Sequence, residues 1–511
     1  MTDTLLVHGR WLITGAGAKD PTLEDGAVAI QAGEIVAVDS LTELRSRYPD
    51  ARQLGGEGMA VLPGLINAHH HSHGVSNLQH GRGDRLLESW LISLGATRPG
   101  DPYLDALLSA GELLRSGVTS VVDVVSGGGL SAEAFDTLCR RTLEGYAEAG
   151  MRVALAPGIS DRNHLLWADE HERAFVEALP EAIRELARRR LPGPQAISRE
   201  EYLAVVRGLH WDYREQPRLD IWFGPPAPGW VSDGFLLAIA DAAAGLGTQI
   251  QTHALESLYE NLHGRRLYGK PTLLHLQDLG LLNPRFSIAH GVWLSEPEIR
   301  AMADSGAAIS HNPSSNLRLR AGRAPLQALL EAGVTVGLGM DGTALNDDED
   351  MFTELRLALR LARPPRYEAR TPQTREVFAM ATGGGARLMG KSHLGWLAPG
   401  QRADLLLVQL GRICWPWVAP ETDPRELVLL RGRRDDVDTV LVDGEVVVQG
   451  GEPTRFDRRE AGMALAERLA GTPLDPALAG QLEALIGPVE DFYRSWPVGD
   501  LVPYRAFNSR R

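Results

Sequence analysis

The central part of the chain alternates short apolar runs with longer helical patterns. Eight apolar runs predict strands, over residues 61–69, 119–125, 152–159, 219–226, 248–254, 286–292, 307–313 and 335–341. Between them lie segments such as DALLSAGELLRSG and EPEIRAMADSG, in which apolar residues recur at helical spacing before a closing glycine. Strands that alternate with helices form parallel sheets, so we expect an α/β fold with a (β/α)8 barrel of the TIM type. A doubly wound open sheet is the alternative.

Both ends of the chain have a different pattern, with short strands and tight turns. The N-terminal part contains TLLVHGRWLIT and two β-rich runs around Ala32–Gly33, and the C-terminal part contains ADLLLVQL and a hairpin signal at Asp443–Gly444. Each piece has too few strands to be stable alone, so we expect them to form one small β-sandwich domain.

This pattern divides the chain into four parts. Residues 1–60 and 396–455 are expected to build the small β-domain, and residues 61–395 the barrel. Residues 456–511 are expected to hold an amphipathic helix, RREAGMALAERLAG, and an aromatic tail without clear periodicity. The long connections 72–118 and 160–218 have the length of lids or binding loops.

Composition and charge exclude several classes of protein. The 511 residues are 44% hydrophobic and 23% charged, which is typical of a globular chain, and the formal net charge is −14. No basic stripe accompanies that charge, so we expect no nucleic-acid partner. Two cysteines, no signal-peptide pattern and no long apolar segment lead us to expect a cytoplasmic protein without a membrane partner.

The strongest chemical signal is NAHHHSHG, residues 67–74, at the end of the first barrel strand. Residues i and i+2 of a strand point to the same side, so His69 and His71 can aim two imidazoles at one point. His70, His73 and His80 are expected to be structural or loop residues. In TIM barrels the active site lies at this carboxyl end of the strands.

Four further residues fall at carboxyl ends of later strands. QTHALES places His253 and Glu256 after the fifth strand, IAHGVWL places His290 at the sixth, and GLGMDG places Asp341 at the eighth. Imidazoles and a carboxylate around an open position suit Zn(II) or Fe(II), which generate hydroxide near neutral pH. The set predicts a metal-dependent hydrolase.

The ordered set PGLINAHHH, THALE, AHGVWL, HNPSSNLRL and GLGMDG resembles the amidohydrolase superfamily. It is most similar to the branch of aminohydrolases and chlorohydrolases that contains cytosine, guanine and S-adenosylhomocysteine deaminases and triazine hydrolases. The resemblance covers nearly the whole chain. It implies a homodimer or homotetramer that acts on a small molecule.

The resemblance also implies the role of each site residue. His69, His71, His253 and Asp341 would hold one divalent metal, Zn(II) or alternatively Fe(II). Glu256 would shuttle protons, His290 would polarise the substrate or orient water, and Asp341 would also accept a proton. Dinuclear relatives carry a lysine at the end of strand four, and LDIWFGPPAPGW has none, so we expect one metal.

Substrate contacts are predicted less directly. Gln79, Arg82 and Trp90 lie in the first long loop and Trp293 follows the sixth strand, where they could serve as polar anchors and flat walls. Asn312 and Asn316 of HNPSSN could bind a ligand or stabilise a turn.

The expected reaction is hydrolysis of a C–N bond other than a peptide bond. The leading hypothesis is deamination of an aminated N-heterocycle (EC 3.5.4 type). The same residues could cleave a urea, carbamate or amidine C–N bond or a heteroaryl carbon–halogen bond. A non-catalytic structural protein is the remote alternative.

Overall fold

The computed structural model describes residues 4–15, 17, 21–193, 195–364 and 367–498 of the chain. Two parallel four-stranded sheets lie at its centre, in the orders β5-β6-β7-β8 and β12-β11-β10-β9. Their strands are β5 (Leu65–His70), β6 (Val118–Ser126), β7 (Arg152–Gly158), β8 (Leu219–Ile221), β9 (Ile250–Ala254), β10 (Phe286–His290), β11 (Ala308–His311) and β12 (Thr335–Leu338).

Backbone contacts join the two sheets at both edges. Phe223, just after β8, forms a parallel bridge with Ile250 at the start of β9. At the other edge the N–H of Asp341, beyond β12, donates to the carbonyl oxygen of His69 in β5 at 3.0 Å. Eight parallel strands joined in this way are the inner ring of a (β/α)8 barrel, and the predicted fold class is confirmed.

Each predicted barrel strand is present, but the first was placed incorrectly. Residues 61–63 are the end of β4 (Arg52–Pro63), which belongs to another sheet, and β5 begins at Leu65. The chain changes sheets at Gly64, where a Cβ atom would lie 2.2 Å from Thr119 Oγ1. An apolar run cannot reveal this change, because the run is buried in both sheets.

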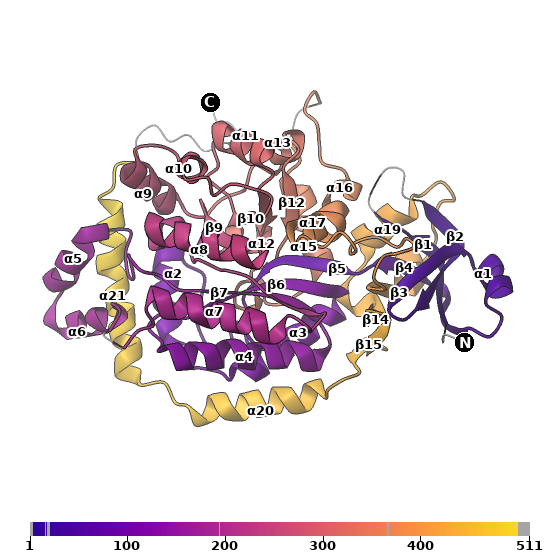
Figure 1. The fold of residues 1–511 in the computed structure, drawn as a ribbon, viewed down its shortest axis with the longest axis horizontal. Coiled ribbons are helices and arrows are strands. Elements are labelled where there is room, and N and C mark those ends of the chain that lie inside the picture. The colour runs from indigo at the N-terminus through magenta and orange to yellow at the C-terminus, as the bar shows by residue number, and fades with distance from the viewer. Residues whose placement is uncertain (1–3, 16, 18–20, 194, 365–366, 499–511) are drawn as a thin grey trace.

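Helices cover the outside of the ring (Figure 1). The covering helices are α3 (Pro102–Arg115), α4 (Ala132–Ala149), α7 (Arg199–Tyr213), α8 (Asp233–Leu246), α10 (Thr272–Asp278), α11 (Glu296–Ser305), α13 (Leu326–Glu331), α15 (Met351–Leu361), α16 (Thr374–Ala379) and α17 (Gly385–Leu388). Helices α4, α8 and α11 end at Gly150, Gly247 and Gly306 in the left-handed conformation, as the glycine-ended patterns predict.

Shorter elements occupy the connections at the carboxyl end of the strands. They are α2 (Leu87–Ser93), η1 (Leu94–Ala96), η2 (Asp169–His171), α5 (Glu172–Ala178), α6 (Glu181–Arg190), η3 (Pro228–Trp230), α9 (Leu258–Tyr268), α12 (Pro313–Arg318) and α14 (Thr343–Asn346). The π-helical turn η4 (Met380–Gly384) instead joins α16 to α17 beside β12. Helices α2, α5 and α6 share an apolar core with the C-terminal helix α21 (Pro476–Arg494), beside which they lie in Figure 1.

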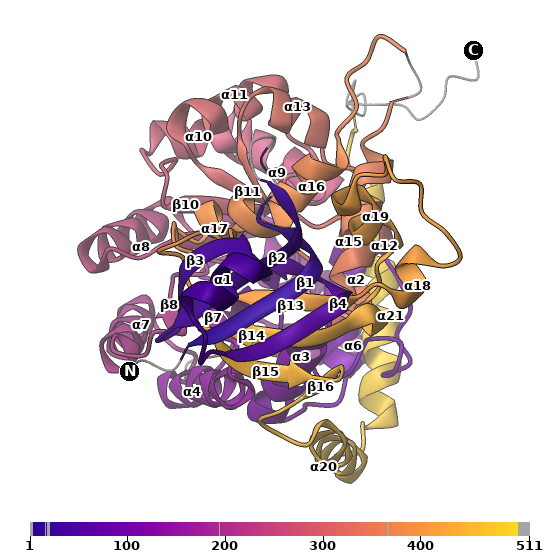
Figure 2. The same cartoon turned by 90° about the vertical axis from the view of Figure 1, so that its right-hand side faces the viewer.

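A second sheet combines both ends of the chain, as predicted (Figure 2). Its order is β16-β15-β14-β13-β4-β1-β2-β3, in one hydrogen-bonded sheet. Besides β4, its strands are β1 (Leu5–Ile13), β2 (Thr22–Gln31), β3 (Glu34–Ser40), β13 (Leu405–Gln409), β14 (Val437–Val442), β15 (Glu445–Gln449) and β16 (Glu452–Pro453). The expected hairpins at Ala32–Gly33 and Asp443–Gly444 are present, with positive φ at all four residues.

This sheet packs against the amino ends of the barrel strands. Leu406 and Val408 of β13 join the large barrel core, while Leu405 and Leu407 face a separate core within the small domain. Arg152, the first residue of β7, donates to Asp404 and Asp443 of the small sheet. The carboxyl ends of the strands therefore lie at the opposite end of the barrel from the small sheet.

The remaining helices are α1 (Leu41–Arg47), α18 (Gly411–Cys414), α19 (Pro424–Arg431), η5 (Arg434–Asp436) and α20 (Arg458–Gly471). Helix α20 coincides with the predicted RREAGMALAERLAG segment. The aromatic tail, expected from Pro488 onward without regular structure, begins instead as helix: α21 continues through Pro488 to Arg494. Leu485, Val489 and Tyr493 bury one face of that helix. Residues 499–511 of that tail lie outside the described residues. Within the described ranges, none of the helices has the length and apolar character needed to cross a bilayer.

Candidate active site

Six residues singled out in the sequence meet at the carboxyl end of the barrel strands. His69 belongs to β5, His253 to β9 and His290 ends β10. The other three, His71, Glu256 and Asp341, closely follow β5, β9 and β12. The positions of all six follow from the parallel arrangement of the strands.

Four of these side chains form a compact donor group. One ligand atom from each of His69, His71, His253 and Asp341 lies within 4.8 Å of all the others. Asp341 Oδ1 is 3.1 Å from His69 Nε2 and 3.5 Å from His71 Nε2, and the Nε2 atoms of His71 and His253 are 3.1 Å apart. Two ligands on one tetrahedral Zn(II) ion are separated by about 3.4 Å, so these spacings suit a metal site.

Neighbouring carbonyl groups fix the tautomers of the three histidines. His71 Nδ1–H donates to the backbone oxygen of Val124 and His253 Nδ1–H to that of Pro226, both at 2.7 Å. His69 Nδ1–H donates to Gln251 Oε1 at 2.8 Å. With the proton on Nδ1, each neutral ring presents the lone pair of Nε2 to the donor group.

These lone pairs require a positive charge between them. His71 Nε2 and His253 Nε2 are both acceptors, so they cannot form a hydrogen bond at 3.1 Å. His69 Nε2 is buried and has no hydrogen-bond partner among the described residues. A divalent cation satisfies all three nitrogens and the Asp341 carboxylate, and the donor set therefore fits one.

Burial keeps the imidazoles of His71 and His253 neutral. It lowers the pKa of His71 to about 4 and that of His253 well below its ordinary value, with neighbouring imidazoles contributing. Neutral imidazole is the form that binds metal, so the site is ready for a cation at pH 7.

Glu256 and His290 lie beside the donor group. Glu256 Oε2 is 3.7 Å from His290 Nε2, which is 3.9 Å from Asp341 Oδ2. Burial, together with the carboxylates of Asp341 and Glu260, raises the pKa of Glu256 well above its ordinary value. Burial also lowers the pKa of His290 to about 4. Glu256 can therefore carry a proton at neutral pH while His290 carries no charge.

Strained backbone aims these side chains into the site. His290 and Asp341 have φ of 75° and 61°, and Leu255, before Glu256, has φ of 55°. Non-glycine residues adopt such values at a cost of about 1–3 kcal/mol, which is typical of functional sites. The next residue, Gly342, has φ of 90°, and a Cβ there would lie 2.3 Å from the His71 carbonyl oxygen. Only glycine fits after Asp341.

Five of the six residues open into one large cavity of about 560 Å³. His71, His253, Glu256, His290 and Asp341 line one part of it. Apolar walls are provided by Leu87, Trp90, Leu91, Leu94, Leu319 and Leu345. The cavity also reaches Leu469 of α20. Its volume is typical of sites for drug-sized ligands.

The sequence of this chain matches the amidohydrolase family over residues 60–447. The chain belongs to this family. The resemblance inferred from its motifs is therefore confirmed. A short segment, residues 26–51, also matches an imidazolonepropionase-like composite domain of bacteria.

Known proteins similar to this amidohydrolase are deaminases and a chlorohydrolase. A 5'-deoxyadenosine deaminase from Methanosarcina mazei is 30% identical over 88% of this chain and 93% of its own. The zinc-bound structure of an adenosine deaminase from Xanthomonas campestris has a TM-score of 0.77 and 27% identity, covering 92% of this chain and 99% of its own. A zinc complex of atrazine chlorohydrolase from Arthrobacter aurescens has a TM-score of 0.76 and 27% identity, covering 91% of this chain and all of its own, 100%.

Of the predicted substrate contacts in the amidohydrolase, Trp90 lines the large cavity. The other five are not among the residues that line it. Gln79 Oε1 accepts from Ser76 N, Arg82 donates to the Ala96 carbonyl, and Trp293 Nε1 donates to the Ala321 carbonyl. Asn312 Oδ1 accepts from Ser310 Oγ, and Asn316 Oδ1 accepts from His290 Nδ1 at 3.0 Å.

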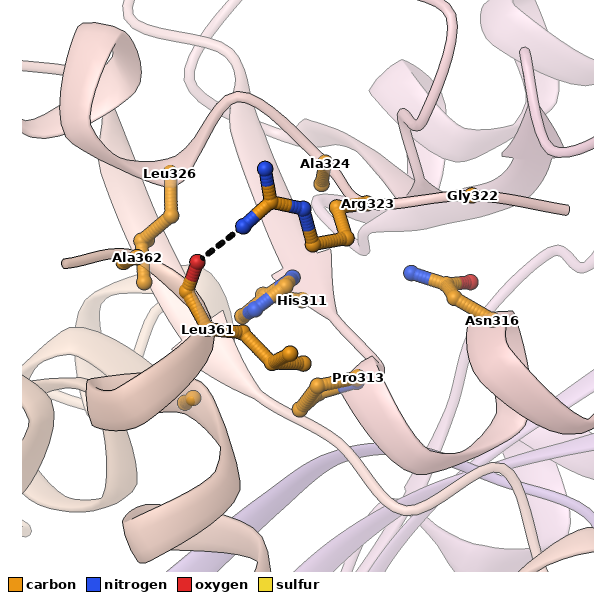
Figure 3. Close-up of a pocket in the computed structure, with 10 residues that line it drawn as sticks. His311, Pro313, Asn316, Gly322, Arg323, Ala324, Leu326, Leu361 and Ala362 are labelled. Carbon is orange, nitrogen blue, oxygen red and sulfur yellow. Dashed lines mark hydrogen bonds between the residues drawn. The ribbon is translucent and has the colours of Figure 1, made fainter. Parts of the chain in front are cut away.

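A second, very small cavity lies behind the site (Figure 3). His311, Asn316 and Arg323 line it, and its volume is about 10 Å³. Arg323 donates to the carbonyl oxygen of Leu361, and the amide nitrogen of Asn316 lies on the side facing His311. This volume is that of a single water molecule, so this cavity is too small for a substrate.

Sequence reasoning missed two residues that orient the site. Gln251 bonds His69, and Glu260 accepts from the backbone N–H groups of Leu255 and Glu256 at 2.8 and 2.7 Å. Both left a signal in the sequence. Gln251 precedes His253 by two residues on the same face of β9, and Ser257-x-x-Glu260 has the spacing of a helix capping box.

Proposed function

We propose that this amidohydrolase is a mononuclear metal-dependent aminohydrolase that releases ammonia from an aminated N-heterocycle of nucleoside size. The observation that carries the proposal is the four-donor group of His69, His71, His253 and Asp341, with Glu256 and His290 beside it in one cavity. The deaminase names of similar proteins support the same reaction.

The metal of the proposal is one Zn(II) ion, with Fe(II) as the alternative. His69, His71, His253 and Asp341 would hold it, and the strand-four segment 219–226 lacks the lysine of dinuclear relatives. When bound, such an ion lowers the pKa of a water molecule to about 7 and so supplies a nucleophile.

The protein's own groups handle the protons. Asp341 accepts one from the attacking water on a carboxylate oxygen. The lone pair of His290 Nε2 orients that water, because Nδ1–H is engaged with Asn316. Glu256, protonated through burial, delivers its proton to the ring nitrogen. The proton that Asp341 accepted from water then passes to the departing amine, and the hydroxyl proton of the adduct returns to Glu256.

The cavity supports a substrate larger than a bare pyrimidine. Its volume of about 560 Å³ leaves room for a substituent beyond the heterocycle. Trp90 and the leucines near it offer a flat apolar wall for the ring, and Arg98, Asn77 and His80 offer polar groups.

Cleavage of a heteroaryl carbon–halogen bond is the second candidate, and the similarity to atrazine chlorohydrolase favours it. The same groups would serve, because the leaving group is selected by the cavity wall. Urea, carbamate and amidine C–N bonds belong to the same alternative.

Ammonia release tests the proposal. The Zn(II)-loaded protein would be incubated with aminated purine nucleosides, the corresponding free bases, pterins and aminated triazines. We expect ammonia from at least one class, and more efficient release from nucleosides than from bases. Glu256→Gln should retain zinc and lose turnover by about 1,000-fold or more.

A negative result has a defined meaning. Suppose that the protein binds one equivalent of zinc per chain but releases no ammonia from any aminated compound. Halide release from chlorinated triazines would then replace the deaminase proposal by the second candidate. Silence on halides and ureas as well would favour a non-catalytic protein.

A further inference from the structure

A second group of metal-binding side chains lies next to the first. It consists of Glu256, His290 and Asp341, each of which places one donor atom within 4.8 Å of the others. Asp341 belongs to both groups. All three residues are buried, so each donor atom is held by the surrounding protein.

In this group, His290 Nε2 is the atom whose surroundings indicate a bound ligand. It is fully buried and has no hydrogen-bond partner among the described residues. Since Nδ1–H donates to Asn316 Oδ1, Nε2 presents a lone pair. That lone pair faces carboxylate oxygens of Glu256 and Asp341 at 3.7 and 3.9 Å, beyond hydrogen-bond distance. The His290 lone pair, the Asp341 carboxylate and the Glu256 carboxyl, once a cation displaces its proton, are three ligands directed at one point and suit a cation.

Asp341 can serve both groups because it uses a different oxygen for each. Oδ1 faces His69 and His71, and Oδ2 faces His290. Ser315 Oγ also donates to Oδ2. An ionised carboxylate has about four acceptor positions, so this hydrogen bond leaves a lone pair on Oδ2 for a metal.

The geometry ranks the two groups by affinity. Ligands on one Zn(II) ion lie about 3.4 Å apart. Three donor–donor distances in the first group are 3.1–3.5 Å, and the two from His290 to the carboxylates of the second are 3.7 and 3.9 Å. The second group must therefore contract by a few tenths of an ångström, and it offers three protein ligands instead of four.

We propose that Glu256, His290 and Asp341 form a second, weaker Zn(II) site that fills only when zinc is in excess, and that its occupation stops turnover. The site itself rests on the geometry of this chain. The inhibition rests on the proposed function, because the ion would bind the groups that deliver and accept protons and would lie where the substrate must approach them.

Equilibrium dialysis of the metal-free full-length protein against Zn(II), with metal analysis, tests the site without any substrate. We expect two equivalents in the wild type, the second on the order of 100-fold weaker than the first. Glu256→Gln and His290→Gln should each keep the tight equivalent and lose the weak one. His80→Gln changes a cavity histidine outside both groups and should keep two.

Two outcomes would overturn the proposal. One is saturation of the wild type at a single equivalent up to millimolar zinc. The other is a second equivalent that binds Glu256→Gln and His290→Gln as tightly as the wild type, which would place the ion elsewhere. Using two variants guards against a folding defect in either one, and the tight equivalent reports that each is folded.

Cobalt and kinetics give independent readouts. Titration with Co(II) should change the visible absorption in two phases in the wild type and in one phase in Glu256→Gln. Activity of the wild type should increase until one equivalent of zinc is bound and decrease as the second binds. A higher substrate concentration should relieve this inhibition. Unchanged activity with the second equivalent bound would refute the inhibitory role. If no substrate is found, the proposed function fails, but the stoichiometry still decides the site.

Discussion

His290 Nδ1 lies 3.0 Å from Oδ1 of Asn316, and both side chains are buried. The contact places the proton of His290 on Nδ1 and fixes the orientation of the ring. Asn316 does not line the large cavity itself. We therefore predict that it acts on the reaction through His290, as a positioning residue.

Replacing Asn316 with Ala should lower kcat by about 10-fold to 100-fold, because the tautomer and orientation of His290 are no longer fixed. Zinc content should stay at one equivalent, since none of the four donors bonds Asn316. Steady-state kinetics and metal analysis measure both quantities. Asn283→Ala, which removes a local turn contact to the Leu281 carbonyl, is the matched control. A kcat equal to that of the control would contradict this role.

Gln251→Ala should weaken zinc binding by about 10-fold to 100-fold. Gln251 Oε1 accepts a hydrogen bond from His69 Nδ1–H, and this bond fixes the tautomer and orientation of the His69 ring. Gln251 Nε2 also donates to the Ala68 carbonyl at 3.0 Å, so the variant should lose some stability as well. Competition with a chromogenic chelator gives the affinity. Gln277→Ala, in α10, serves as the control, and equal zinc affinity in the two variants would contradict the prediction.

Zinc should stabilise the folded protein. The facing lone pairs of His71 and His253 repel each other without a cation, and an ion at 100 times its Kd adds about 2.7 kcal/mol. Thermal unfolding of the chelator-treated protein with and without zinc should show a rise in Tm. His253→Ala should abolish this rise, whereas His210→Gln in α7 should preserve it. A zinc-dependent rise that survives in His253→Ala would place the stabilising ion elsewhere.

Acid should weaken the contact between barrel and small sheet. Burial alone would raise the pKa of Asp443, but Arg152, Arg402 and Arg218 lower it to about 2 from an ordinary 3.8. The folded carboxyl thus releases its proton more readily than the unfolded one. Its contribution to stability is present above about pH 4 and is lost as pH falls towards 2.

Asp443→Asn tests that contribution. At pH 7 it should lower the free energy of unfolding by about 3 kcal/mol, because Arg152 loses a buried partner. Between pH 4 and 2 the difference from the wild type should shrink. Urea unfolding at several pH values measures this, with the exposed Asp50→Asn as control. A difference that is independent of pH would exclude the ionised form of Asp443 as the cause.

Helix α20 should affect the size of substrate that the cavity accepts. Leu469 lines the cavity, so Leu469→Trp should raise KM for substrates of nucleoside size about 10-fold and leave KM for free bases and kcat unchanged. Met463→Trp places the same side chain on an exposed part of the helix. Equal KM values in the two variants would show that substrate does not reach α20.

A parallel α/β fold and the placement of the donors at the strand ends could be predicted from the sequence alone, whereas the choice of a barrel over an open sheet needed the contacts that close the ring. Apolar runs separated by helical patterns specify parallel strands, and the carboxyl ends of parallel strands meet at one end of a barrel. His69, His71, His253, His290 and Asp341 therefore had to meet once the strands were recognised. These are local patterns of period 2 and 3.6, which a single chain displays directly.

Contacts between elements far apart in the sequence determine which nitrogen of each histidine faces the site and which residues line the cavity. The backbone carbonyl of Val124 in β6 accepts from His71 Nδ1–H, and that of Pro226, after β8, accepts from His253 Nδ1–H. Leu469, which lines the cavity, belongs to the C-terminal helix α20. Trp293, close to His290 in sequence, instead donates to the Ala321 carbonyl. Such contacts arise only when the barrel closes and the C-terminal helices pack against it, because they join residues whose sequence spacing carries no shared period.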